Sequence, residues 1–200
     1  MSVGPVKDED GLPLGDVGPW VQDKHSRLQR YIGISSSVRA KFIGPGKAGA
    51  TYIDLYCGPA RSLERTSSTF VDGSAIVAAL TAEESGHPFS EIHIADVDPT
   101  AVRASAARLH ARGITTPIYE YGGRAEDTVR QVKERLNRFA LHVVFLDPFG
   151  LADLPFSVIH ELSVLSRPDI LVHVSAMDLQ RNLGKASRVQ EHTNCHKKTR

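Results

Sequence analysis

Five short runs of apolar residues recur along the chain, and longer segments with apolar residues at helical spacing separate them. Short apolar runs that turn residues bound are typical of β-strands. The last two runs, "LHVVFL" and "DILVHV", are apolar enough to predict strands buried on both faces, as in a parallel sheet. The predicted strands cover residues 51–56, 91–95, 117–121, 141–146 and 169–174.

Helical patterns fill the remaining regular segments. Asp98 is a suitable N-cap and Pro99 suits the first position of a helix that stops at Gly113. The other predicted helices cover residues 19–41, a segment that begins near Ser74, residues 126–138 and residues 155–165. Because strands and helices alternate, the pattern predicts right-handed crossovers and a doubly wound, mostly parallel α/β sheet.

Three segments lack either pattern. Residues 1–18 are rich in glycine and proline, which predicts a flexible N-terminal arm. Residues 59–72 are polar and predict a long loop before the second helix. Residues 184–200 are polar without a strand pattern, which predicts a disordered tail.

Composition limits the class of protein. The 200 residues suit one domain, and 41% hydrophobic with 24% charged residues is ordinary for a globular protein. A net charge of +1 does not point to a polyanionic partner. Two cysteines are too few for a disulfide framework, and neither a signal segment nor a membrane span is apparent. These features predict a cytoplasmic protein without membrane association.

Acidic residues and glycines lie where the predicted strands end. In a doubly wound sheet, ligands bind beyond the carboxyl ends of the strands. The first strand ends in "YIDLYCGP", where Asp54 can bind loop amides or a cationic ligand group and Gly58 permits close approach of the backbone. A tight turn stiffened by an acid, without any ligand, explains the same residues equally well.

The second strand ends in Asp96 and Asp98. An acid at this position is the usual acceptor for ribose hydroxyls in nucleotide-binding folds. Asp96 lies 38 residues after Gly58, against about 20 in the dinucleotide fingerprint, and the chain has no G-x-G-x-x-G. The pattern therefore disfavours a dinucleotide oxidoreductase. A helix cap explains Asp98 better than ligand contact does.

The fourth strand runs into "DPFG". Asp147 can accept hydrogen bonds from a planar amine, as can the carbonyl of Pro148, and Phe149 offers an aromatic face for stacking. A strand-ending turn without a ligand is the alternative. The position matches the strand ends at Asp54 and Asp96.

An ordered set of motifs resembles the three-Cys-motif partner protein family (TcmP). The motifs are "GPWVQDKHSRLQRYI", "YIDLYCGP", "GSAIVAAL", "IHIADVDP", "VVFLDPFG" and "MDLQRN", over about residues 19–183. This family is similar to class I S-adenosylmethionine-dependent methyltransferases. The resemblance implies a Rossmann-like methyltransferase-type domain at 19–183, S-adenosylmethionine as cofactor and a three-Cys-motif protein as partner. It also implies two further strands after residue 183, so the chain is expected to lack the last strands.

The resemblance also implies site residues. Asp54 would meet the methionine end of the cofactor, and Asp96 would hold the ribose hydroxyls. The turn that Gly58 opens would pass beneath the cofactor, and the first helix would close its pocket. Asp147, Pro148 and Phe149 would face the methyl acceptor as candidate catalytic residues. The full set of candidate cofactor-binding residues is Asp54, Tyr56, Gly58, Pro59, Asp96, Asp98, Trp20 and Lys24, and the later motif contributes Arg181 and Asn182 without an assigned role.

The chain departs from the family at several of these motifs. Ala60 replaces a glycine, Asp96 a glutamate and Ala75 a proline. The acid that would recognise the adenine amine is Arg124 here, and Glu126 or Asp127 can substitute for it.

The remaining cysteines and histidines favour structural roles. Cys57 has no evident partner base and is expected to be a small buried residue. His93, His142 and His173 lie within strand patterns and are expected in the core or at a sheet end. His192, Cys195 and His196 are a weak ligand set at the chain's end, so no metal site is predicted.

Three functions remain open at this point. The leading hypothesis is an S-adenosylmethionine-dependent methyltransferase-like protein that acts on a nucleobase or another amine. A catalytically weak partner or scaffold module of a three-Cys-motif protein complex is the second. An NAD-type oxidoreductase is the third, and the missing glycine fingerprint disfavours it.

Overall fold

The computed structural model describes residues 7–175 and 179–180. Five parallel strands form the central sheet, in the order β6-β5-β2-β7-β8. Their bounds are β2 Ala50–Asp54, β5 Glu91–Asp96, β6 Ile118–Gly122, β7 Leu141–Leu146 and β8 Pro168–Val172. The predicted strands are confirmed to within a few residues. The order is that of a Rossmann-like, doubly wound sheet, with its reversal between β2 and β7.

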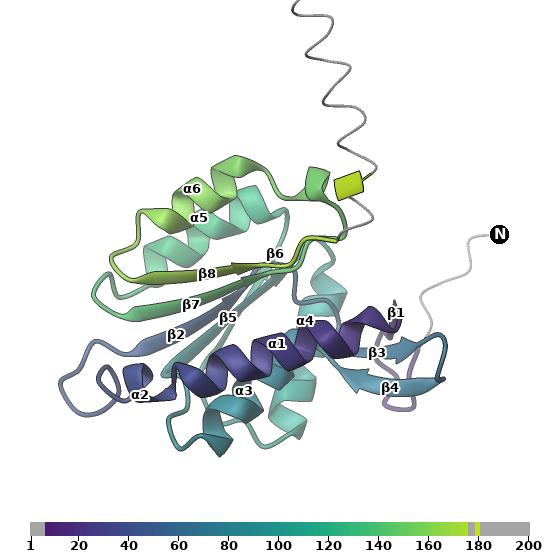
Figure 1. The fold of residues 1–200 in the computed structure, drawn as a ribbon, viewed down its shortest axis with the longest axis horizontal. Coiled ribbons are helices and arrows are strands. Elements are labelled where there is room, and N and C mark those ends of the chain that lie inside the picture. Colours follow the sequence, from purple (N-terminus) through teal and green to yellow (C-terminus); the bar gives the residue numbers. More distant parts are fainter. Residues whose placement is uncertain (1–6, 176–178, 181–200) are drawn as a thin grey trace, which may run out of the picture.

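Helices cover both faces of the sheet (Figure 1). The first group, on one face, is α1 Trp20–Ile34, α3 Ser74–Glu84 and α4 Pro99–Ala111; the second group, on the other, is α5 Ala125–Arg135 and α6 Phe156–Ser163. Each group encloses its own hydrophobic cluster against the strands. β2 and β7 are buried along their whole length, as parallel strands with a neighbour on each side should be.

β8 differs from the expectation of a strand buried on both faces. Its residues are half-buried or exposed, because β7 is its one neighbour within the described part of the chain. Residues 181–200, which include Arg181, Asn182 and the predicted tail, lie outside the described residues.

The predicted helix over residues 19–41 is two helices, α1 and the short α2 Ser36–Arg39. Polar side chains interrupt it. The carbonyl of Ile32 accepts a hydrogen bond from the hydroxyl of Ser35 and another from the Arg39 guanidinium. Side chains of this kind compete with the backbone for the helical acceptor, so the helix ends there.

A second, three-stranded sheet replaces the predicted long loop and part of the predicted arm. Its strands are β1 Gly15–Val17, β3 Arg61–Glu64 and β4 Thr69–Asp72. β3 and β4 form a hairpin, and β1 pairs with β3 in parallel. The structure therefore differs from the expected flexible arm at residues 7–17, and the described residues do not include 1–6.

Arg108 on α4 holds this second sheet against the central one. Its guanidinium donates to the carbonyls of Pro13 and Pro59, at 2.8 Å and 2.7 Å, and to the carboxylate of Asp10. Asp8 is buried and pairs with Arg61 at 3.0 Å. These links join the N-terminal segment to the turn that follows β2.

Candidate functional site

The carboxyl ends of the parallel strands gather at one edge of the sheet. Asp54 ends β2, Asp96 ends β5, and Gly122 ends β6; Asp147 comes directly after β7 and His173 directly after β8. Because the order reverses between β2 and β7, this edge is where a doubly wound sheet offers a ligand crevice.

Asp96 and Gly58 lie in direct contact, although 38 residues separate them. One carboxylate oxygen of Asp96 accepts the Gly58 amide at 3.0 Å, and the other accepts the Asp98 amide at 2.9 Å. Each oxygen keeps acceptor capacity for a further donor. Asp96 is half-buried, and the space above the Gly58 Cα is open. These properties fit the hydroxyl pair of a ribose.

The turn after β2 needs an unusual backbone. Gly58 and Ala60 have φ values of +55° and +59°, in the left-handed region where a side chain is strained by about 1–2 kcal/mol. The carbonyl of Ala60 accepts the amide of Gly73, which leads into α3. A Cβ on Gly73 would lie 2.6 Å from the Ala60 Cα, so the turn packs directly on the helix start. A glycine at position 60 would adopt this conformation without strain.

Asp54 is fully buried beneath this turn. Its carboxylate accepts hydrogen bonds from the Ser74 hydroxyl at 2.6 Å, the Tyr56 amide at 3.1 Å and the Tyr52 hydroxyl at 3.3 Å. Burial raises its pKa to about 6, although the bonds from Ser74 and Tyr56 oppose this. Asp54 thus fixes the turn and does not face solvent, and its contact with the methionine end of the cofactor stays a prediction.

Several other candidates have structural roles as well. Asp98 caps α4 by accepting the Thr100 amide at 2.8 Å, which confirms the cap interpretation and lowers the pKa of Asp98. The hydroxyl of Tyr56 donates to the carbonyl of Asp153, and the carbonyl of Pro59 accepts from Arg108. Trp20 begins α1 with its ring over Gly18 and is more than half exposed.

Lys24 and Asp147 form an ion pair across 123 residues of sequence. Lys24 Nζ lies 2.5 Å from Asp147 Oδ2, and His173 Nδ1 lies 2.7 Å from Asp147 Oδ1. The side chains of Lys24, Asp147 and His173 are 11%, 19% and 29% exposed, so water screens these contacts only partly. Lys24, expected at the cofactor pocket, thus lies against the residue expected to face the acceptor.

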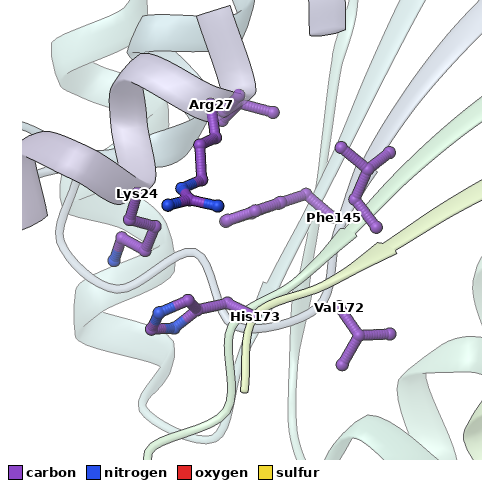
Figure 2. A pocket seen from close by; sticks show the side chains of 7 residues that line it. Lys24, Arg27, Phe145, Val172 and His173 are labelled. Atoms are coloured by element: carbon purple, nitrogen blue, oxygen red, sulfur yellow. The ribbon is translucent and has the colours of Figure 1, made fainter. Parts of the chain in front are cut away.

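A cleft of about 290 Å³ adjoins this cluster, and we call it the α1–β8 cleft (Figure 2). Helix α1 and strands β7 and β8 form it. Its lining residues are Lys24, Arg27, Leu28, Phe145, Leu171, Val172 and His173. A second cavity of about 380 Å³ lies over β6 and α5, and its lining residues are Tyr121, Gln131, Glu134 and Arg135. Neither cavity is lined by Asp96 or Gly58.

The other predicted acceptor-side and adenine-side residues lie around the same edge. Phe149 is fully exposed and Pro148 is half-buried. The amide of Gly123 donates to the carbonyl of Asp96, which places the start of α5 beside the β5 end. Glu126 pairs with Arg124 at 3.6 Å on the surface, and Asp127 is exposed in the first turn of α5.

His173 and His25 are the site residues that the sequence did not suggest. His173 directly follows β8, as Asp147 directly follows β7. Its position at a strand end could therefore have indicated a site residue. His25 lies beside Lys24 on α1; burial, reinforced by the Lys24 charge, lowers its pKa to about 4. His93 and His142 are fully buried, as expected of core residues.

Other reactive chemistry is limited in the described residues. Cys57 is buried as expected, and burial raises the pKa of its thiol. Over residues 7–175 and 179–180, no three His, Cys, Asp or Glu side chains are arranged to hold a metal ion. In the same part of the chain, no helix has the length and apolar character to span a membrane. His192, Cys195 and His196 lie outside it.

The chain resembles a solved structure, although the two other comparisons found no match. No protein-family model matches the chain, and no curated protein matches it. A solved structure of a geranyl diphosphate methyltransferase in complex with GPP and sinefungin is similar at 16% identity and a TM-score of 0.40. The match covers 86% of this chain and 61% of that protein, so the chain spans about three fifths of its length. The fold assignment rests on the chain's own strand order, since a likeness of this degree identifies neither ligand nor reaction.

Proposed function

We propose that this protein binds S-adenosylmethionine above the carboxyl ends of β2 and β5 and is a methyltransferase-like protein of the three-Cys-motif partner type. The observation that carries the proposal is the contact between Asp96 and Gly58, which sets an accessible carboxylate beside an open turn at the edge where such sheets bind nucleotides. When bound, S-adenosylmethionine supplies an electrophilic methyl group on a sulfonium.

The chain's own residues would act by positioning. Asp96 would accept the two ribose hydroxyls while it holds the Gly58 turn, and Asp54 would keep that turn rigid from below. Asp147 and its partners lie across the switch point from Asp96 and would face the methyl acceptor. Methyl transfer needs no covalent enzyme intermediate, so alignment of the acceptor and exclusion of water would supply most of the acceleration.

Asp96→Ala tests the cofactor site. The variant should bind S-adenosylmethionine or its demethylated product about 10–150-fold more weakly, because a charge-assisted hydrogen bond is worth roughly 1.5–3 kcal/mol. Isothermal titration calorimetry measures this directly. The wild type should also bind either compound more tightly than NAD.

The matched control is Glu84→Gln, an exposed acid at the end of α3. It should leave the affinity unchanged. Equal affinity of wild type and Asp96→Ala for S-adenosylmethionine would show that Asp96 does not bind the cofactor. Tighter binding of NAD than of S-adenosylmethionine by the wild type would instead support the oxidoreductase hypothesis. The melting temperature of Asp96→Ala without ligand, compared with that of the wild type, shows whether the variant has lost only a ligand contact or also the folded turn.

A catalytically weak partner module is the second candidate, and Phe149 favours it. This side chain is fully exposed beside Asp147, where it can meet either a planar acceptor or a three-Cys-motif protein. In an enzyme, Phe149→Ala should raise the KM for a planar acceptor, since stacking is worth about 1–3 kcal/mol per base. In a partner module it should instead weaken complex formation.

The KM for the acceptor is measured with a radiolabelled methyl donor, and complex formation is measured by pull-down of a three-Cys-motif protein. Phe139→Ala is the matched control, because Phe139 is an exposed phenylalanine at the opposite, N-terminal end of β7. If wild type labels no nucleic acid, protein or small amine, alone or with the partner, the partner module is the better account.

A further inference from the structure

The hydrogen bonds of Asp147 fix which nitrogen of His173 is free. Burial alone would raise the pKa of Asp147, but the bond from His173 and the charge of Lys24 outweigh it and hold the pKa below its ordinary value. Asp147 is therefore ionised and can only accept hydrogen bonds. His173 therefore donates through Nδ1, and whenever the ring carries a single proton this leaves a lone pair on Nε2.

His173 lies in the wall of the α1–β8 cleft. In Figure 2, Lys24 and Arg27 extend from α1 toward the strands, and His173 lies below Lys24. Leu28, Phe145, Leu171 and Val172 make the rest of the lining apolar. At about 290 Å³ the cleft is at the small end of ligand sites, which run from about 300 to 1,000 Å³. It suits a small molecule with an apolar body.

The charged side chains around the cleft determine which ligand charge it can accept. Its lining includes Lys24 and Arg27 and no acid. Asp147 already binds Lys24, and Asp23 pairs with Arg27 on the exposed side of α1. His25 on α1 and the buried Tyr52 and Asp54 also interact electrostatically with the cluster. A cationic amine would find no unpaired acid among the lining residues, whereas a neutral acceptor needs no ionic partner and its developing negative charge would lie near Lys24 and Arg27.

We infer that His173 is the base that takes the proton from a small, planar, neutral methyl acceptor bound in the α1–β8 cleft, one with a weakly acidic O–H or ring N–H. This inference rests on the proposed function, and it replaces amines in general with a neutral acceptor that carries an acidic proton. The acceptor's lone pair forms the bond to the methyl carbon, and the carbon–sulfur bond breaks with its electrons on sulfur. The acceptor's proton passes to Nε2 of His173 and then to water. Asp147 stabilises the imidazolium that forms.

Two readouts on the full chain need no methyl donor. Nitrogen-15 NMR of His173 should show a protonated Nδ1 and an unprotonated Nε2 at pH 8, and Asp147→Asn should alter that tautomer. The probes 4-methylphenol and 1-methyluracil should shift the Nε2 resonance, whereas 4-methylbenzylamine, a cation, should not. Comparison of the first two probes distinguishes an acidic O–H from a ring N–H.

The kinetic readout uses the accepted probe with S-adenosylmethionine. His173→Gln should lower kcat about a hundredfold with KM within a few-fold, and should abolish the ionisation of a base from the pH–rate profile. His160→Gln, an exposed histidine on α6, is the matched control and should change nothing.

Three results would overturn the inference: a protonated Nε2, tighter binding of the amine than of both acidic probes, or an unchanged pH–rate profile in His173→Gln. Failure to bind S-adenosylmethionine would overturn the proposed function instead, since the tautomer and probe measurements do not depend on it. If His173→Gln does not fold, the tautomer measurement on wild type and Asp147→Asn still tests the inference.

Discussion

Replacement of Asp147 by alanine is expected to reduce turnover on the order of a hundredfold or more, while affinity for S-adenosylmethionine stays within a few-fold. Asp147 is the shared partner of Lys24 and His173, so its loss releases both side chains where the methyl acceptor is proposed to bind. The Asp96 contact with Gly58, which would bind the cofactor, does not involve Asp147. Single-turnover kinetics and calorimetry on one preparation measure the two effects separately.

The design must separate catalysis from folding. Asp147→Ala leaves the mostly buried Lys24 without its partner, so some loss of stability is expected. Asp147→Asn keeps the shape, and Asp153→Ala, an exposed aspartate six residues later, is the matched control. If melting temperature, cofactor affinity and turnover all fall together in Asp147→Asn, Asp147 serves only the turn.

Removal of the charge from Asp54 is expected to change how stability depends on pH. Burial raises its folded pKa to about 6, from an ordinary value of 3.8. A raised folded pKa means that the stabilising contribution is present below the unfolded pKa and is lost as pH rises through about 6. The difference between the two pKa values corresponds to about 3 kcal/mol of unfolding free energy.

The comparison is between wild type and Asp54→Asn, by urea denaturation from pH 4 to pH 8. The carbonyl oxygen of asparagine can accept the Tyr56 amide, and its NH2 group can donate to the Ser74 hydroxyl, but asparagine does not ionise. Wild type should lose most of about 3 kcal/mol relative to the variant over this range. His25 and His142, whose pKa values are lowered to about 4, destabilise both proteins at acid pH, so only the difference between them reports Asp54. A difference that does not vary with pH would mean that Asp54 is not a buried ionising group.

Sequence patterns predicted the central sheet well because buried strand positions require apolar side chains, and these appear as short apolar runs in the sequence. β2 and β7 are buried throughout and lie within two of the predicted apolar runs, and α4 begins at the cap and proline that signalled it. The Asp96 position beside the β2 turn followed from the parallel arrangement alone. The α1–α2 break was missed because it depends on where the Arg39 guanidinium donates its hydrogen bonds, and this is not a local preference.

The second sheet shows why the rest of the topology could not be predicted from the sequence. β1, β3 and β4 are short and largely polar, so they resemble loop, and their pairing joins residues 15–17 to 61–64. Arg108 holds that pairing in place through carbonyl and carboxylate groups of the N-terminal segment and the β2 turn. A strand with little apolar surface forms only where such partners are already present.

The sequence by itself determined the doubly wound class, the positions of the five central strands and the acids at their ends, because hydrophobic periodicity and turn chemistry are local properties. Only the tertiary structure decided what those acids do. It buried Asp54 within the turn, left Asp96 accessible, and joined Asp147 to Lys24 and to His173. Hydrogen bonds and partial burial create these roles, and both depend on side chains that meet only when distant segments pack together.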